Sequence, residues 1–149
     1  MSPGYISSET RRLVAARADG LCEYCLVHDV HCLKPHEVDH IQSLKHGGSS
    51  GLSNLAFACH ECNRCKGTDV GTILPRSGRF SRLYHPRTDA WLEHFRLEGI
   101  FIIGVTDIGI ATARVLYFSE RERVRHRERL WTFRVYPPPE ALRRMGLSE

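Results

Sequence analysis

Residues 58–67, which read ACHECNRCKG, decide the fold of the first half of the chain. Cys59 and Cys62 are spaced C-x-x-C, and Cys22 and Cys25 form an earlier pair with the same spacing. Such a turn brings two sulfurs close enough to share one tetrahedral zinc ion, so the two pairs make a complete four-thiolate site. A closed site of this kind leaves no position for water or substrate. We therefore expect a Zn²⁺ ion with a structural role.

Other ligand sets remain open from the residues alone. Cys62 and Cys65 are also spaced C-x-x-C. Further candidate ligands are Cys32, His28, His31 and His60. We prefer Cys59 with Cys62, because Cys59 follows the apolar run LAFA, from which a strand would deliver it into a turn. Cys65 would fall inside the helix expected next, so Cys65 and Cys32 are interpreted as free thiols.

The segment between the two cysteine pairs predicts a hairpin. Val38 and Ile41 flank Asp-His, and Leu55 and Phe57 alternate with small residues, so two short strands are expected with a long Gly- and Ser-rich loop between them. The segment after the second pair contains no helix breaker until Gly67, which predicts a short helix. The expected order is strand, strand, helix.

The stretch from Cys22 to Gly67 resembles the ββα-metal core of HNH endonucleases, in the subset that is stapled by zinc. The motifs C-x-x-C, V-D-H-I, G-G, N-L, C-x-x-C-N and K-G occur in the order of the family. The resemblance implies an α+β fold, in which a ββα-metal (HNH) core with a structural four-cysteine zinc site follows an N-terminal helix and precedes a C-terminal α/β extension.

The pair Asp39-His40 carries the chemistry that phosphodiester hydrolysis needs. A histidine with a pKa near 6.5 can take a proton from water at neutral pH, and a carboxylate is a hard oxygen ligand for Mg²⁺. Successive strand residues point to opposite faces, so both side chains can reach one region only where the strand ends or bulges. The strand is expected to end here, where the loop begins.

The resemblance assigns roles to four side chains. It implies that His40 is the general base, that Asp39 is a metal ligand and that Asn54 braces the loop and the base. Asn63 falls where many members place a second metal-ligating histidine, so this chain is an HNN variant. An amide oxygen suits Mg²⁺, so Mg²⁺ (or Mn²⁺) is the expected catalytic ion.

The expected substrate is DNA, in its double-stranded form, which the enzyme would nick or cut. The net charge of +4 is weakly in favour of a polyanionic partner. The expected phosphate contacts are Lys45, Lys66, Arg76, Arg79 and Arg82. Two alternatives are kept: a zinc-stapled nucleic-acid-binding module without catalysis, and an RNA-directed nuclease.

The length of 149 residues predicts a single domain, with the nuclease core at residues 8–67 and the extension at residues 68–149 packed on it. No apolar run approaches the roughly 20 residues that span a bilayer, so no membrane partner is expected. The first residues, MSPGYISSETRR, lack the features of a secretory signal, which predicts a cytoplasmic location.

Outside the core the sequence predicts a helix capped by Ser8, with Leu13, Val14 and Ala18 along one side and Gly20 as its stop. The Gly-, Pro- and Arg-rich segment from Thr68 to Arg87 predicts an extended wrap over the core.

Further along, Trp91 and Phe95 predict a short helix with a buried aromatic pair, and residues 96–105 predict a hairpin that turns at Glu98-Gly99. Thr106 is expected to cap a helix. The run SERERVRHRERLW interleaves Glu and Arg, which is typical of a solvated helix held by i,i+4 ion pairs.

Overall fold

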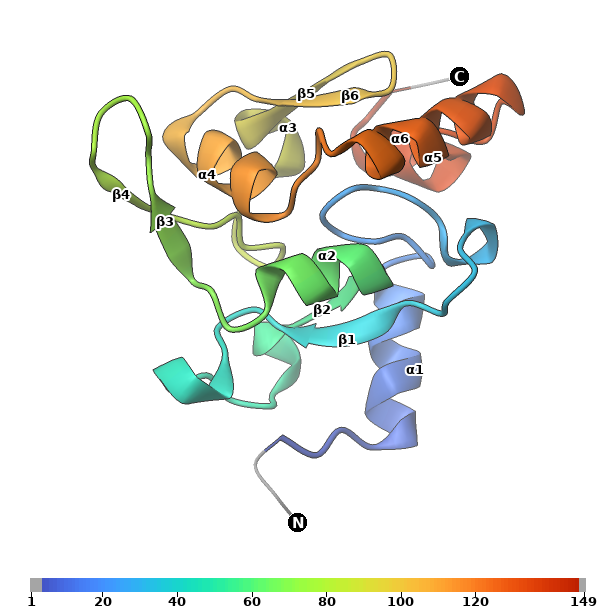
Figure 1. Cartoon of the computed structure of the whole chain (residues 1–149). Helices are drawn as coiled ribbons and strands as arrows, with labels where there is room; N and C mark the ends of the chain where they lie inside the picture. Colours follow the sequence, from blue (N-terminus) through green and yellow to red (C-terminus); the bar gives the residue numbers. More distant parts are fainter. Residues whose placement is uncertain (1–3, 148–149) are drawn as a thin grey trace.

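The computed structural model describes residues 4–147 and places the extension above the first half of the chain (Figure 1). The lower half contains α1 (Ser8–Arg17), η1 (Asp29–His31), β1 (Glu37–His40), η2 (Leu44–His46), η3 (Leu52–Asn54), β2 (Leu55–Ala58) and α2 (His60–Lys66). The upper half contains β3 (Gly71–Ile73), β4 (Phe80–Arg82), α3 (Trp91–His94), β5 (Phe95–Glu98), β6 (Phe101–Gly104), α4 (Asp107–Val115), α5 (Arg121–Thr132) and α6 (Pro139–Arg144). The mixed α+β class expected from the sequence is confirmed.

The lower half is built on an antiparallel hairpin. Strand β1 pairs with β2 in a register that opposes Glu37 to Ala58 and His40 to Leu55. Helix α2 follows β2 directly, so the predicted order of strand, strand and helix is confirmed. Gly47 takes a φ of 88° in the long connection between the strands, a backbone conformation that glycine adopts without a steric penalty.

Helix α1 packs against β2. Ser7, and not the predicted Ser8, is the N-cap, and its side chain accepts a hydrogen bond from the amide of Thr10. Val14 is fully buried, whereas Leu13 is half exposed, so the prediction of Leu13 on the apolar side is wrong. The helix reaches only to Arg17, whose guanidinium donates to the carbonyl oxygens of Leu52 (2.9 Å) and Leu55 (2.6 Å).

The extension contains two further hairpins. The segment expected as an extended wrap instead forms the hairpin β3–β4, which opposes Gly71 to Arg82. The hairpin β5–β6 turns after Glu98 as predicted, with Gly99 at a φ of 61°. The predicted aromatic pair is also present, since the rings of Trp91 and Phe95 lie 4.9 Å apart.

Helix α4 begins as predicted. The hydroxyl of Thr106 accepts a hydrogen bond from the amide of Gly109, which is the N-cap interaction that the sequence indicated. The short helix α6, by contrast, was not anticipated from the sequence.

Helix α5 departs from the solvated helix that the sequence predicts. Arg123 and Arg127 are buried, with 8% and 1% of their surface exposed. Arg127 donates to the carbonyl oxygens of Ile100 (2.7 Å) and Phe118 (2.6 Å). Buried arginines are stable where carbonyls and other acceptors satisfy their donors, and both helix arginines find such partners in the fold.

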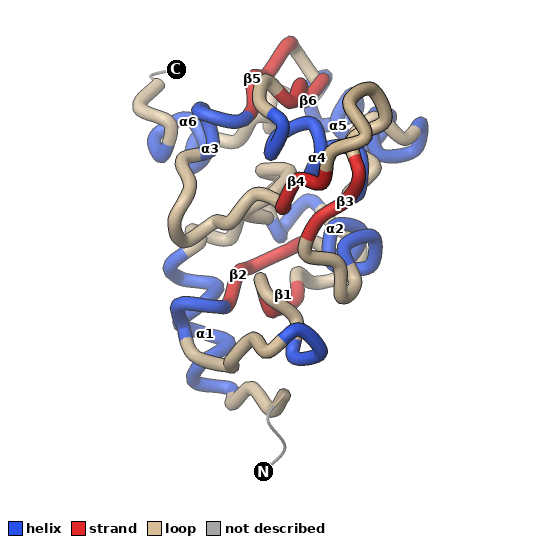
Figure 2. Tube along the Cα trace, turned by 90° about the vertical axis from the view of Figure 1, so that its left-hand side faces the viewer, coloured by secondary structure: helices blue, strands red, loops and turns tan. Residues whose placement is uncertain are grey.

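One hydrophobic cluster joins the two halves of the molecule. It includes Tyr24 and Cys25 from the lower half and Trp91 and Tyr136 from the extension. The indole of Trp91 donates to the carbonyl oxygen of Tyr24 (2.9 Å), and the hydroxyl of Tyr136 donates to that of Cys25 (2.8 Å). Figure 2, turned by 90° about the vertical axis, shows the extension lying above the first half of the chain. None of the helices within residues 4–147 is long and apolar enough to span a membrane.

Candidate active site and metal centre

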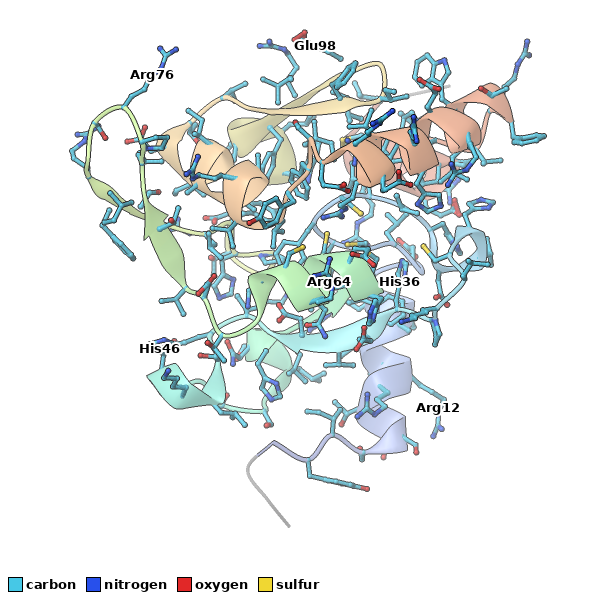
Figure 3. All side chains as sticks on the ribbon, in the orientation of Figure 1. Arg12, His36, His46, Arg64, Arg76 and Glu98 are labelled. Atoms are coloured by element: carbon cyan, nitrogen blue, oxygen red, sulfur yellow. The ribbon has the colours of Figure 1, made fainter. Side chains whose placement is uncertain are left out.

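Four buried cysteines meet between α2 and the extension, where Figure 3 shows sulfur atoms gathered. The sulfurs of Cys22, Cys25, Cys59 and Cys62 all lie within 4.8 Å of one another. The Cys25 and Cys59 sulfurs are 3.8 Å apart, and a tetrahedron with Zn–S bonds of about 2.3 Å has edges of about 3.8 Å. The donor set and its spacing therefore fit Zn²⁺. Cys32 and Cys65 lie outside this group.

The two cysteine pairs are held by turns of the same kind. The amide of Cys25 donates to the sulfur of Cys22 (3.4 Å), and the amide of Cys62 donates to that of Cys59 (3.3 Å). Cys59 is also the N-cap of α2, so a candidate zinc ligand begins the helix that carries Asn63.

Burial and mutual hydrogen bonds shift the pKa values of three of the four thiols. Burial raises the pKa of Cys22 and of Cys62, whereas hydrogen bonds from the other cysteines lower the pKa of Cys25. A bound cation would favour the deprotonated thiolates that act as metal ligands.

His40 lies at the last position of β1 and is partly buried. Its Nε2 atom is 3.0 Å from the hydroxyl of Ser50 in the following loop. The carbonyl oxygen of His40 accepts a hydrogen bond from the ammonium of Lys66 (2.9 Å). Ser50 in the loop thus orients the imidazole ring of His40, and Lys66 of α2 anchors its backbone carbonyl.

Asn54 closes the loop between β1 and β2. Its side-chain oxygen accepts from the amide of Gln42 (2.9 Å), and its Nδ2 donates to the carbonyl oxygens of Gln42 (2.9 Å) and Ser49 (2.7 Å). These bonds fix the segment that presents Ser50 to His40.

Asp39 is buried, with 3% of its surface exposed. Its carboxylate accepts hydrogen bonds from the hydroxyl of Tyr24 (2.7 Å) and from the ammonium of Lys66 (3.2 Å). Burial raises the pKa of Asp39, and the charge of Lys66 opposes that rise. The Lys66 side chain is 1% exposed, so its ammonium is engaged inside the protein and is not presented to a phosphate.

Asn63 lies on α2 opposite the start of β1. Its amide donates to a carboxylate oxygen of Glu37 (3.3 Å), and the other oxygen of Glu37 is 2.9 Å from Nδ1 of His60. No sequence motif marks Glu37, but its position two residues before Asp39 places both side chains on the same strand face.

The family comparison covers this part of the chain. Residues 22–69 match the family model described as HNH endonuclease. This stretch is similar to an HNH domain. The predicted family is thereby confirmed, and the domain indicates a nuclease or nucleic-acid-binding role. No curated protein and no solved structure matches the chain.

The HNH domain offers oxygen donors of the kind that Mg²⁺ takes, a carboxylate at Asp39 and an amide oxygen at Asn63. Both oxygens of Asp39 already accept hydrogen bonds, and one of the donors carries a positive charge. A divalent cation at Asp39 would therefore share the carboxylate with Lys66 or displace its ammonium.

Two of the basic residues expected to contact phosphates form ion pairs within the protein. Arg79 pairs with Asp107 (3.1 Å), and Arg82 makes two hydrogen bonds to Asp89 (2.7 and 3.0 Å). Arg79 and Arg82 keep 72% and 50% of their side-chain surface exposed in these pairs. Arg76, which extends from the β3–β4 turn (Figure 3), and Lys45 on η2 are exposed as well.

Proposed function

We propose that the chain is a metal-dependent endonuclease that hydrolyses phosphodiester bonds of DNA, by nicking or cutting, with His40 as general base. The observation that carries the proposal is the fixed, partly exposed imidazole at the end of β1 within an HNH domain. A side chain that abstracts a proton must be held in place. The imidazole of His40 is held by Ser50, which lies in the loop that Asn54 closes.

The tautomer of the ring decides which nitrogen of His40 acts. When Nε2 donates its proton to the hydroxyl of Ser50, Nδ1 carries the lone pair and takes the proton from the attacking water. Ser50 then stabilises the imidazolium by orienting the ring, as the partner of a catalytic histidine does in other hydrolases.

A catalytic Mg²⁺ or Mn²⁺ would be held by Asp39 and Asn63. Such an ion would stabilise the negative charge on the phosphate and the leaving oxygen. Lys66 is 3.2 Å from Asp39 and holds the carbonyl of His40, so it links the carboxylate and the base. Lys45 and Arg76 are the proposed contacts to the backbone of double-stranded DNA.

One observation favours the alternative of a nucleic-acid-binding module without catalysis. The carboxylate proposed to hold the catalytic metal is buried and already neutralised by Lys66. In that case zinc would staple the fold while phosphodiester chemistry is absent.

The deciding experiment is an assay of supercoiled plasmid and of single-stranded RNA in EDTA, Mg²⁺ and Mn²⁺. We expect His40→Ala to lower metal-dependent DNA cleavage at least 100-fold, since general bases contribute about 10²–10⁴-fold. His46→Ala, which changes an exposed histidine of the same loop, is the matched control and should cleave like the wild type. Equal cleavage by His40→Ala and wild type would refute the role of His40. Tight DNA binding with no cleavage in any metal would favour the binding module, and cleavage of RNA alone would favour an RNA-directed nuclease.

A further inference from the structure

An arginine from outside the HNH domain contacts the candidate zinc ligands. Arg123 lies in the first turn of α5, and its Nη2 atom is 2.9 Å from the sulfur of Cys62 and 3.8 Å from that of Cys59. The match to the HNH family model ends at residue 69, so Arg123 lies outside the matched segment. The mixed-charge pattern of the helix gave no sign of it.

The guanidinium is held on its other sides as well. Its Nη1 atom donates to the carbonyl oxygen of Leu116, and its carbon lies 5.6 Å from the centre of the Phe118 ring. The side chain of Glu120 accepts from the amide of Arg123 (3.2 Å), which fixes the start of the helix. Arg123 is therefore positioned by its own segment and aimed at the sulfurs.

The charge of a filled site requires such a partner. Four thiolates carry four negative charges and Zn²⁺ carries two positive ones, so a filled site keeps two negative charges in the interior. Buried charge is costly unless it is paired and hydrogen-bonded. The backbone amides of Cys25 and Cys62 supply hydrogen bonds to the sulfurs, and Arg123 adds a full positive charge.

Arg123 also lines a cavity beside the cluster. A cavity of about 600 Å³ borders the cluster, and its wall includes Cys25, Cys59 and Arg123. A chelator that approaches through this cavity would meet the guanidinium beside the sulfurs.

We propose that Arg123 is a positioning residue of the zinc site, which lowers the charge of the tetrathiolate centre and slows loss of the metal. Zinc retention by the HNH domain then depends on a side chain that the extension supplies. The proposal is independent of whether the chain cleaves nucleic acid, because it concerns the zinc site alone.

The test uses the full-length protein loaded with Zn²⁺ and then with Co²⁺. In Arg123→Met we expect zinc affinity, measured by competition with a chromogenic chelator, to fall about 10- to 100-fold, as is typical when a partner of a metal ligand is removed. The thiolate-to-Co²⁺ charge-transfer band should move to lower energy, because thiolates that lose a hydrogen bond give up electrons more readily. Zinc release should also be faster.

The matched control is Arg127→Met, which removes the other buried arginine of α5 without touching a sulfur. We expect it to lower stability while leaving the charge-transfer band in place and zinc affinity within about threefold of wild type. An unchanged band and wild-type zinc affinity in Arg123→Met would overturn the proposal, as would equal zinc loss in both variants without a band shift. If Arg123→Met does not fold, Arg123→Gln decides, because it removes the positive charge: a shifted band supports the proposal and an unshifted one refutes it.

Discussion

Asp39 and Lys66 form an ion pair that water scarcely reaches. The side chains are 3% and 1% exposed, and the hydroxyl of Tyr24 donates to the same carboxylate. A buried pair of this kind contributes less through its own attraction than through the penalty that follows when one partner is lost. Each of the two residues therefore requires the other.

We predict that Lys66→Met lowers the free energy of unfolding by about 3–5 kcal/mol, the usual cost of leaving one buried charge without its partner. The double variant Asp39→Asn/Lys66→Met should recover most of that loss, because no charge then remains. Denaturant unfolding of the wild type, both single variants and the double variant measures the coupling. A Lys66→Met protein within about 1 kcal/mol of wild type would contradict a buried, paired carboxylate.

At this scale the sequence was informative about which residues matter and less informative about what they touch. The spacing of the cysteines predicted the group that meets in space, because a C-x-x-C turn is a local structure. The pairing of Asp39 with Lys66, and the contact of His40 with Ser50, depend on how a helix and a loop pack on β1. No local pattern encodes that packing.

Among the elements, the hairpin β3–β4 is tied to the chain that follows it by Asp89. The carboxylate accepts two hydrogen bonds from Arg82 and one from the amide of His85 (2.8 Å). The hydrogen bonds from Arg82 hold the pKa of Asp89 below its ordinary value of 3.8. The folded protein therefore binds this proton less readily than the unfolded chain does.

The sign of the pH effect follows from that shift. A carboxyl whose pKa is lower in the folded state adds stability above its ordinary pKa and loses it as the pH falls through the folded value. We predict that Asp89→Asn is less stable than wild type by about 1 kcal/mol at pH 7, since Arg82 is half exposed. The difference should shrink as the pH falls below 3.8. Unfolding curves at pH 7 and pH 3 measure it, and a constant difference would argue against an ionised Asp89 as the cause.

Helix α5 illustrates why the sequence predicted that a helix forms better than which of its faces is buried. Its buried positions are Arg123, Arg127 and Leu130, which recur at helical spacing. Arginine is usually exposed, so a pattern of apolar residues does not reveal this face. The face became buried because the extension supplies carbonyl oxygens and the cysteine cluster supplies sulfurs as acceptors.

For the whole molecule, the shared core makes the two halves depend on each other. Trp91, Phe95, Phe118 and Tyr136 from the extension belong to the same cluster as the buried cysteines. The HNH domain alone would expose the surface that these side chains cover, and the loss of that burial removes a main source of stability.

We predict that a fragment of residues 1–69 neither folds cooperatively nor retains zinc like the full chain. The fragment lacks both the aromatic cover and Arg123. Circular dichroism, limited proteolysis and zinc content of the fragment and of the full chain provide the measurement. A fragment that unfolds cooperatively with one tightly held zinc would show that the domain is self-sufficient.

The position of Cys59 has a consequence for how the protein can be inactivated. This residue is the N-cap of α2 and a member of the cysteine cluster, and Asn63 lies one helical turn beyond it. Thiols that lose their metal are open to oxidation and alkylation. Oxidants and electrophiles that reach the cluster would therefore disorganise the start of α2 and silence the proposed chemistry, without modifying the histidine that performs it.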